Sequence, residues 1–86
     1  MYSRKVSNPK TRNTIVVYML YFAREMGRQP TVREIGEAAG LHSTSTTAGY
    51  LERMVRDGLL CKSEQRYRNY FVNPDLRILP AFRKAG

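Results

Sequence analysis

The sequence predicts a mainly α-helical fold with a small β-hairpin, and three observations support this prediction. Apolar residues recur at helical spacing in three segments, and each segment has a helix-start signal and a following glycine. Two short strand-like segments come after them. At 86 residues the chain is long enough for one domain with a small core. We expect this domain at residues 9–73, between a basic flexible arm at 1–8 and a tail at 74–86.

The first helix is expected to begin at Pro9 and to stop at Gly27. Proline is favoured at the first helical position, Asn8 is a good cap in front of it, and glycine readily ends a helix. Spacings of three and four predict a wide apolar stripe that faces the core. The stripe comprises Ile15, Val16, Met19, Leu20, Phe22, Ala23 and Met26.

Two shorter helices follow, at about residues 32–39 and 44–57. Thr31 and Glu34 have the spacing of a capping box, and Ser43 can cap the third helix. Gly40 and Gly58 supply the stops, so a tight turn of residues 40–42 joins the two helices. This pattern is typical of a helix-turn-helix. We expect its helices to be held against the first one by apolar contacts, because short helices are marginal alone.

Residues 59–62 and 69–72 are strand candidates on either side of a charged loop. They predict a β-hairpin, although the loop lacks the usual Asn-Gly turn signal. The expected fold is therefore a three-helix winged helix-turn-helix. The tail has further apolar residues without a sustained period, and we expect it to pack on the first helix, pair with a second copy or stay loose. These residues are Leu76, Ile78, Leu79 and Phe82.

The net charge of +8 is unevenly distributed along the chain. Residues 1–30 have six Lys or Arg against one Glu, and residues 61–86 have six against two acids. Residues 31–60 have three against four, so the helix-turn-helix itself is almost balanced. Basic flanks favour a polyanionic partner, and eleven of the fifteen cations are arginines, which suit phosphate and guanine. The alternative is a basic surface that serves only solubility.

Several classes of protein are disfavoured. Cys61 and His42 are the single cysteine and histidine, so we expect neither a disulfide nor a bound metal. No recognisable catalytic spacing or glycine-rich phosphate loop is present, which predicts a non-enzyme without a cofactor. No apolar run is long enough to span a bilayer and no secretory signal is apparent, so a cytoplasmic location is expected. RNA binding is disfavoured because the aromatic sheet motifs are missing.

An α-helix fits the major groove of duplex DNA, where small hydroxyls can read base edges. The third helix offers such groups in its first turns, and we expect Thr47 to point inward instead. Ser43 has a competing role as the cap, Gly49 allows close approach to DNA or to another helix, and Tyr50 suits the groove edge or the core. The candidate base contacts are Ser43, Ser45, Thr46, Gly49 and Tyr50.

Phosphate contacts are expected from the flanks, where they would position the domain without specifying sequence. The alternatives are a turn-filling role for His42, a solvated loop at the wing, and pairing of Arg53 and Arg56 with Glu52 or Asp57. The candidate backbone contacts are Arg4, Lys5, Lys10, Arg12, Thr31, His42, Arg53, Arg66, Tyr67 and Arg68.

Residues 10–72 resemble the amino-terminal DNA-binding domain of the LexA repressor family. The resemblance rests on the Pro-Thr-x-x-Glu-Ile opening at 30–35, the Gly-Leu-x-Ser turn at 40–43, and Leu51 with Met54 before Gly58. It implies a third helix that reads the major groove and a wing on the backbone, with Arg68 where the family's wing often has arginine. The chain stops at Gly86 without the self-cleaving peptidase domain, so self-cleavage is not implied.

The sequence as a whole predicts a small bacterial or phage transcriptional regulator that binds double-stranded DNA. The alternative function is a winged-helix interaction module that binds a transcription or repressor protein. Specific DNA sites are commonly read by dimers, and we expect weak or DNA-assisted pairing through residues 76–82.

Overall fold

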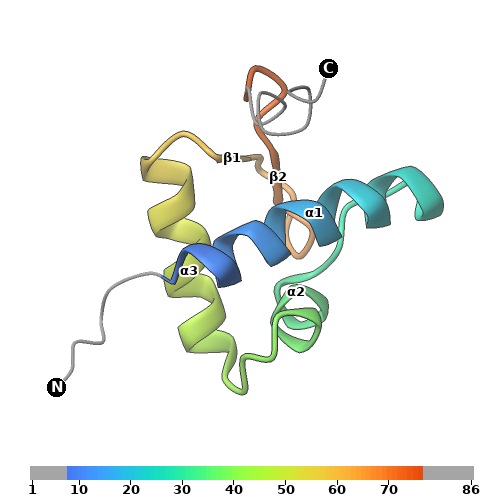
Figure 1. The fold of residues 1–86 in the computed structure, drawn as a ribbon. Helices are drawn as coiled ribbons and strands as arrows, with labels where there is room; N and C mark the ends of the chain where they lie inside the picture. Colours follow the sequence, from blue (N-terminus) through green and yellow to red (C-terminus); the bar gives the residue numbers. More distant parts are fainter. Residues whose placement is uncertain (1–7, 77–86) are drawn as a thin grey trace, which may run out of the picture.

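The computed structural model of the chain describes residues 8–76. Three helices, α1 (Pro9–Met26), α2 (Val32–Ala38) and α3 (Thr44–Arg56), precede two strands, β1 (Leu60–Lys62) and β2 (Tyr70–Val72). In Figure 1, α1 crosses the centre of the view, with α2 on one side of it and the hairpin on the other. This order and arrangement confirm the predicted winged helix-turn-helix.

The helix starts lie where the caps predicted them. The Asn8 side chain accepts a hydrogen bond from the Lys10 amide at 2.9 Å. At α2, the Glu34 amide donates to Thr31 Oγ1 at 3.1 Å and the Thr31 amide donates to Glu34 Oε1 at 2.8 Å, which completes the capping box. The helix ends differ slightly, because α2 and α3 each stop one residue before the predicted position.

The core is formed by one side of each helix and by the hairpin. Ile15, Val16 and Met19 of α1 are buried and Phe22 and Ala23 are half-buried, but two residues of the predicted stripe are exposed: Leu20 at 45% and Met26 at 54%. The stripe was predicted too wide, because Leu20 lies on the uncovered side of α1 and Met26 is its last residue. The other buried apolar residues are Ile35, Leu51, Met54, Leu60 and Tyr70.

Gly36 of α2 packs directly against Thr47 of α3. A Cβ atom at this position would lie 2.5 Å from Thr47 Oγ1, too close for the side chains to remain where they are. Thr47 is 1% exposed, and its hydroxyl donates to the Ser43 carbonyl at 2.9 Å. Thr47 therefore points inward, as predicted, and glycine at position 36 allows the two helices to pack around it.

The hairpin pairs β1 and β2 in antiparallel register, with Leu60 opposite Val72 and Lys62 opposite Tyr70. The strands are shorter than predicted, since the ladder leaves out Leu59 and Asn69. Leu76, the first apolar residue of the tail, packs against the core. The remaining apolar tail residues, Ile78, Leu79 and Phe82, lie outside the described part of the chain.

Candidate nucleic-acid interface

The first turns of α3 present a row of small hydroxyls. Ser43 Oγ accepts hydrogen bonds from the Ser45 and Thr46 amides at 3.1 and 3.2 Å, so this side chain caps the helix. The Ser45 and Thr46 side chains are exposed. The helix therefore has a buried side and an exposed side in its first turns: Thr47 lies in the core, while Ser45 and Thr46 face outward.

The exposed side of α3 is bordered by two other elements. On one border the Asn8 amide donates to Tyr50 Oη at 3.3 Å, which joins the start of α1 to α3. On the other, Glu52 contacts the hairpin through Lys62 and Tyr70. Successive helical residues are about 100° apart, so Tyr50 and Glu52 lie about 160° apart across the exposed side of α3, and the outward hydroxyls lie within that arc.

One of the two roles that the sequence left open for Tyr50, packing against the core, is present in the structure. Its ring is half-buried against the core, and the Arg53 guanidinium lies over it at 5.4 Å from the ring centre. Tyr50 therefore forms the edge of the α3 surface and supports a cation there.

Gly49 makes no tight helix contact, which corrects one of its two predicted roles. A Cβ atom at this position would meet only the flexible Arg53 guanidinium, at 3.4 Å from Nη1. The close packing of helices occurs at Gly36 instead. Gly49 lies on the same side of α3 as the exposed hydroxyls, and the Arg53 guanidinium is the side-chain group nearest to it.

Arg12 is tied to α3 and is only partly available to a ligand. Its Nη2 atom lies 2.5 Å from Asp57 Oδ2, and its side chain is 23% exposed. The hydrogen bond from Arg12 holds the pKa of Asp57 below its usual range. Arg56 also lies 3.8 Å from Asp57, in agreement with one predicted pairing.

The wing loop at 63–69 contains two kinds of cation. Arg66 and Tyr67 are exposed, and Tyr67 is 67% exposed. Arg68 is half-buried, and its Nε atom has no hydrogen-bond partner among the described residues. Arg68, a candidate phosphate contact on the wing, lies near α2, where it adds to the lowering of the Glu34 pKa that is caused chiefly by the Thr31 amide.

Glu52 links α3 to the loop end of the hairpin, a contact that the sequence did not predict. Lys62 Nζ lies 2.6 Å from Glu52 Oε2, and Tyr70 Oη donates a short hydrogen bond to the same oxygen. These two donors, Lys62 first, hold the pKa of Glu52 below its usual range. The expected pairing of Arg53 and Arg56 with Glu52 or Asp57 is confirmed for Arg56 and Asp57, while Glu52 binds Lys62 and Tyr70. No local pattern indicates the contact, because its partners are 10 and 18 residues away.

The other candidate contacts are distributed around this surface. Lys10 and His42 are exposed, whereas the Thr31 hydroxyl is bound within the capping box. Arg4 and Lys5 lie outside the described residues. A hollow at the helix-turn-helix is lined by Arg33, Glu37, His42, Ser43 and Thr44, among others, so charged and hydroxyl groups adjoin the start of α3.

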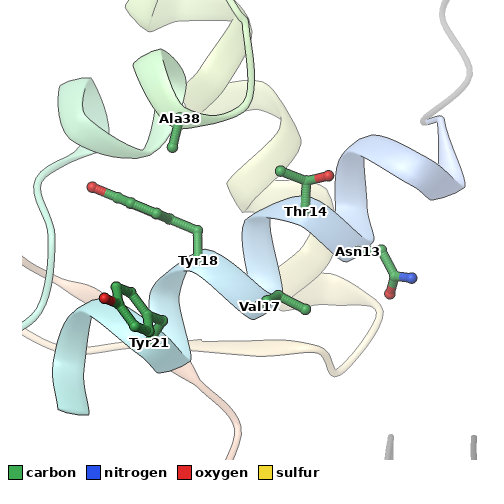
Figure 2. Close-up of a pocket in the computed structure, with 6 residues that line it drawn as sticks. All are labelled: Asn13, Thr14, Val17, Tyr18, Tyr21 and Ala38. Atoms are coloured by element: carbon green, nitrogen blue, oxygen red, sulfur yellow. The ribbon is translucent and has the colours of Figure 1, made fainter. Parts of the chain in front are cut away.

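A second hollow has a different chemical character. Figure 2 shows it between α1 and Ala38 of α2, with the side chain of Tyr18 reaching toward α2 and that of Tyr21 beside it. None of its lining residues is charged. This hollow therefore differs from the one at the helix-turn-helix, whose lining includes Arg33 and Glu37. Among the described residues, no helix is both long and apolar enough to cross a membrane.

Comparisons with known proteins agree with the geometry. The family model of the LexA DNA binding domain matches residues 11–69. The LexA repressor of Brevibacillus brevis is 39% identical over 79 residues, which cover 78% of this chain and 38% of the relative. That of Exiguobacterium sibiricum is 40% identical over 65 residues, covering 76% and 31%. That of Leuconostoc mesenteroides is 54% identical over 44 residues, covering 51% and 21%.

The chain spans less than two fifths of the length of these curated relatives. The matched region covers nearly all of α1, the whole of α2, α3 and β1, and the wing loop up to the residue before β2, and it agrees with the resemblance predicted from the sequence. The family model covers well over half of the chain, and this chain accordingly belongs to the LexA family of amino-terminal DNA-binding domains.

Proposed function

We propose that the chain binds duplex DNA sequence-specifically and acts in transcriptional regulation. The main supporting observation is the exposed hydroxyl side of α3, which is bordered by the start of α1 and the wing and adjoins cations on both. The family assignment supports the same function, since the relatives are repressors by name. An α-helix fits the major groove, where hydroxyls can donate to or accept from base edges.

In this proposal Ser45, Thr46 and Gly49 approach the bases, and Tyr50 lies at the groove edge. Ser43 serves chiefly as the helix cap. Exposed Lys10, His42, Arg66 and Tyr67 contact the phosphates, with weaker contributions from the tied Arg12 and Arg68. Arg53, Thr31 and the arm residues Arg4 and Lys5 complete the proposed backbone contacts. Phosphate contacts set the position of the domain, whereas base contacts determine sequence preference.

A duplex titration across salt concentrations tests the proposal. Neutralising about six to eight phosphates should give a slope of roughly −5 to −7 in log affinity against log salt. The target sequence can first be obtained by selecting bound duplexes from a random library. Absence of binding at low salt would refute DNA binding, and a flat salt dependence would refute the phosphate contacts.

The roles of the wing and of α3 are separable with two substitutions. Arg66→Ala should weaken all duplexes by a similar factor and reduce the salt slope by about 1. Thr46→Ala should instead change the preference at one base position, by about 1 kcal/mol. If Arg66→Ala changed base preference while Thr46→Ala weakened all duplexes equally, the two roles would be wrongly assigned.

Binding to a transcription or repressor protein is the second candidate function. It is favoured by the uncovered side of α1, where Val17 is 53% exposed and Tyr21 is 62% exposed. Salt-dependent duplex binding that is unaffected by Val17→Ser would support the first function over this one.

We further propose that two copies assemble on a palindromic duplex through the tail, with half-sites about one helical turn apart or a multiple of it. Sedimentation that shows a strict monomer with and without such a duplex would exclude this assembly.

A further inference from the structure

The hairpin is too small to determine its own position on the domain. Its ladder has only three residue pairs, and two-stranded hairpins of this size are at best marginal in water. Leu60 and Tyr70 anchor it through burial at 2% and 5% exposure. This apolar anchor leaves the direction of the loop to be determined by other contacts.

At the loop end of the ladder the polar contacts are made by Glu52, while Arg68 within the loop lies near α2. Lys62 and Tyr70 form the last ladder pair before the loop, and both bind the same Glu52 carboxylate oxygen. Lys62 Nζ also lies over the Tyr70 ring, 5.4 Å from its centre. One carboxylate on α3 therefore holds both strands where the loop leaves the ladder.

We propose that Glu52 is a positioning residue: it holds the wing loop at a fixed place relative to α3 so that Arg66 meets the DNA backbone while α3 occupies the groove. This inference rests on the proposed function, because it assigns Glu52 a part in the same binding event. Glu52 acts through the wing and does not itself contact DNA.

The sign of the effect separates this role from simple electrostatics. Removing an acidic side chain from a surface that faces a polyanion should strengthen binding, because it removes repulsion. It should also release Lys62 as an additional cation. The positioning role predicts the opposite. If the freed loop is correctly placed about one fifth of the time, the apparent Kd rises about fivefold.

Three variants test this role in duplex titrations. Glu52→Ala should weaken binding about fivefold, and Tyr70→Phe, which changes no charge and keeps the ring, should weaken it about two- to threefold. Glu64→Ala removes a carboxylate from the exposed wing loop without touching the Glu52 contacts, and it should strengthen binding. Equal strengthening by Glu52→Ala and Glu64→Ala would overturn the proposal.

A double-mutant cycle with Arg66→Ala shows whether Glu52 acts through the wing. The effect of Glu52→Ala should fall below about twofold once Arg66 is absent, because the loop then lacks this phosphate contact. An unchanged effect in both backgrounds would overturn the proposal. Circular dichroism melting controls for folding, and Glu52→Ala should melt normally because the side chain is half exposed and alanine favours helix.

Amide hydrogen exchange of the free protein supplies a test that does not require DNA. Glu52→Ala should increase exchange in β1 and β2 while the amides of α1 and α3 keep their protection. Unchanged exchange in the hairpin would overturn the proposal whether or not DNA binds. If the unsubstituted chain binds no duplex but the hairpin loosens, the proposed function fails and Glu52 is still shown to hold the wing.

Discussion

The α2–α3 unit and the wing are neighbours on the same small domain, yet different forces hold them in place. In the α2–α3 unit, fully buried Ile35, Leu51 and Met54 pack together, and Gly36 closes directly on Thr47. The wing has two buried residues, and Val72 packs against the core while partly buried; its loop end is held by polar contacts of the half-exposed Glu52. The comparison indicates that the helices form a rigid unit, while the wing can be loosened without unfolding the domain.

The largest expected effect comes from a charge placed in the packed unit. Ile35→Asp should unfold the domain, wing included, because Ile35 is 0% exposed and an unpartnered buried carboxylate is very costly. Circular dichroism should show loss of the cooperative melting transition. Val17→Asp on the exposed side of α1 is the matched control and should melt almost normally. An unchanged transition in Ile35→Asp would contradict the packing described here.

A smaller but more specific effect is expected at the contact between α2 and α3. Gly36→Ala should destabilise the domain by about 1–3 kcal/mol, because the new methyl group would overlap Thr47 Oγ1. The chemical denaturation midpoint measures this change. Adding Thr47→Ala removes the clashing oxygen, so the pair should be less destabilised than the sum of the single changes. Strict additivity would show that the two residues do not constrain each other.

Gly49→Ala should have the reverse effect on stability. Its methyl group would meet only a flexible arginine, so the domain should gain up to about 1 kcal/mol from improved helix propensity. If α3 approaches DNA closely, the same change should weaken duplex binding. Loss of stability in Gly49→Ala would indicate a tight contact that the structure does not contain. Gly49 would then be closely packed, as Gly36 is.

The smallest expected effect is the response of the wing to acid. The contacts of Glu52 with Lys62 and Tyr70 lower its pKa in the folded state. These contacts therefore stabilise the fold at pH values above the pKa of Glu52 in the unfolded chain, near 4.5, and this stabilisation is lost as the pH falls through the lowered pKa of the folded state. Because Glu52 is half exposed, this contribution should stay below about 1 kcal/mol. As the pH is lowered from 6 to 3, the NMR signals of the hairpin should stay unchanged until the pH falls through this lowered pKa of Glu52, and should shift only then.

Glu52→Gln provides the control for this acid response. It should flatten the titration of the hairpin signals but leave that of the α2 capping box, where the pKa of Glu34 is lowered independently by the Thr31 amide. If the hairpin signals titrated identically in Glu52→Gln, another carboxylate would cause the titration. The contacts of Glu52 with Lys62 and Tyr70 would then not determine how the wing responds to acid.

Local signals made most of the fold predictable. The caps at Asn8, Thr31 and Ser43 depend on residues two or three positions apart, so the sequence shows both partners together. The widths of apolar faces were harder to predict, since periodicity orients a helix but does not show how much of it its neighbours cover. Leu20 illustrates this limit, because it follows the apolar pattern and is still exposed.

The candidate interface was less predictable because several of its features depend on residues distant in the sequence. Arg12 meets Asp57 across 45 positions, and Tyr70 meets Glu52 across 18. Both contacts decide which charges are available, and neither has a local pattern. The two glycines show the same limit. The sequence predicted a close approach at Gly49, whereas the close contact between α2 and α3 is made by Gly36.

The division of α3 between an inward and an outward side has an evolutionary consequence. Thr47, Leu51 and Met54 face the core, whereas the Ser45 and Thr46 side chains are exposed. Changes at exposed positions away from caps typically alter stability by less than about 0.5 kcal/mol. Under the proposed function, a descendant could therefore acquire a new operator preference at these two positions while inheriting an intact scaffold, so target choice and foldability can be selected separately.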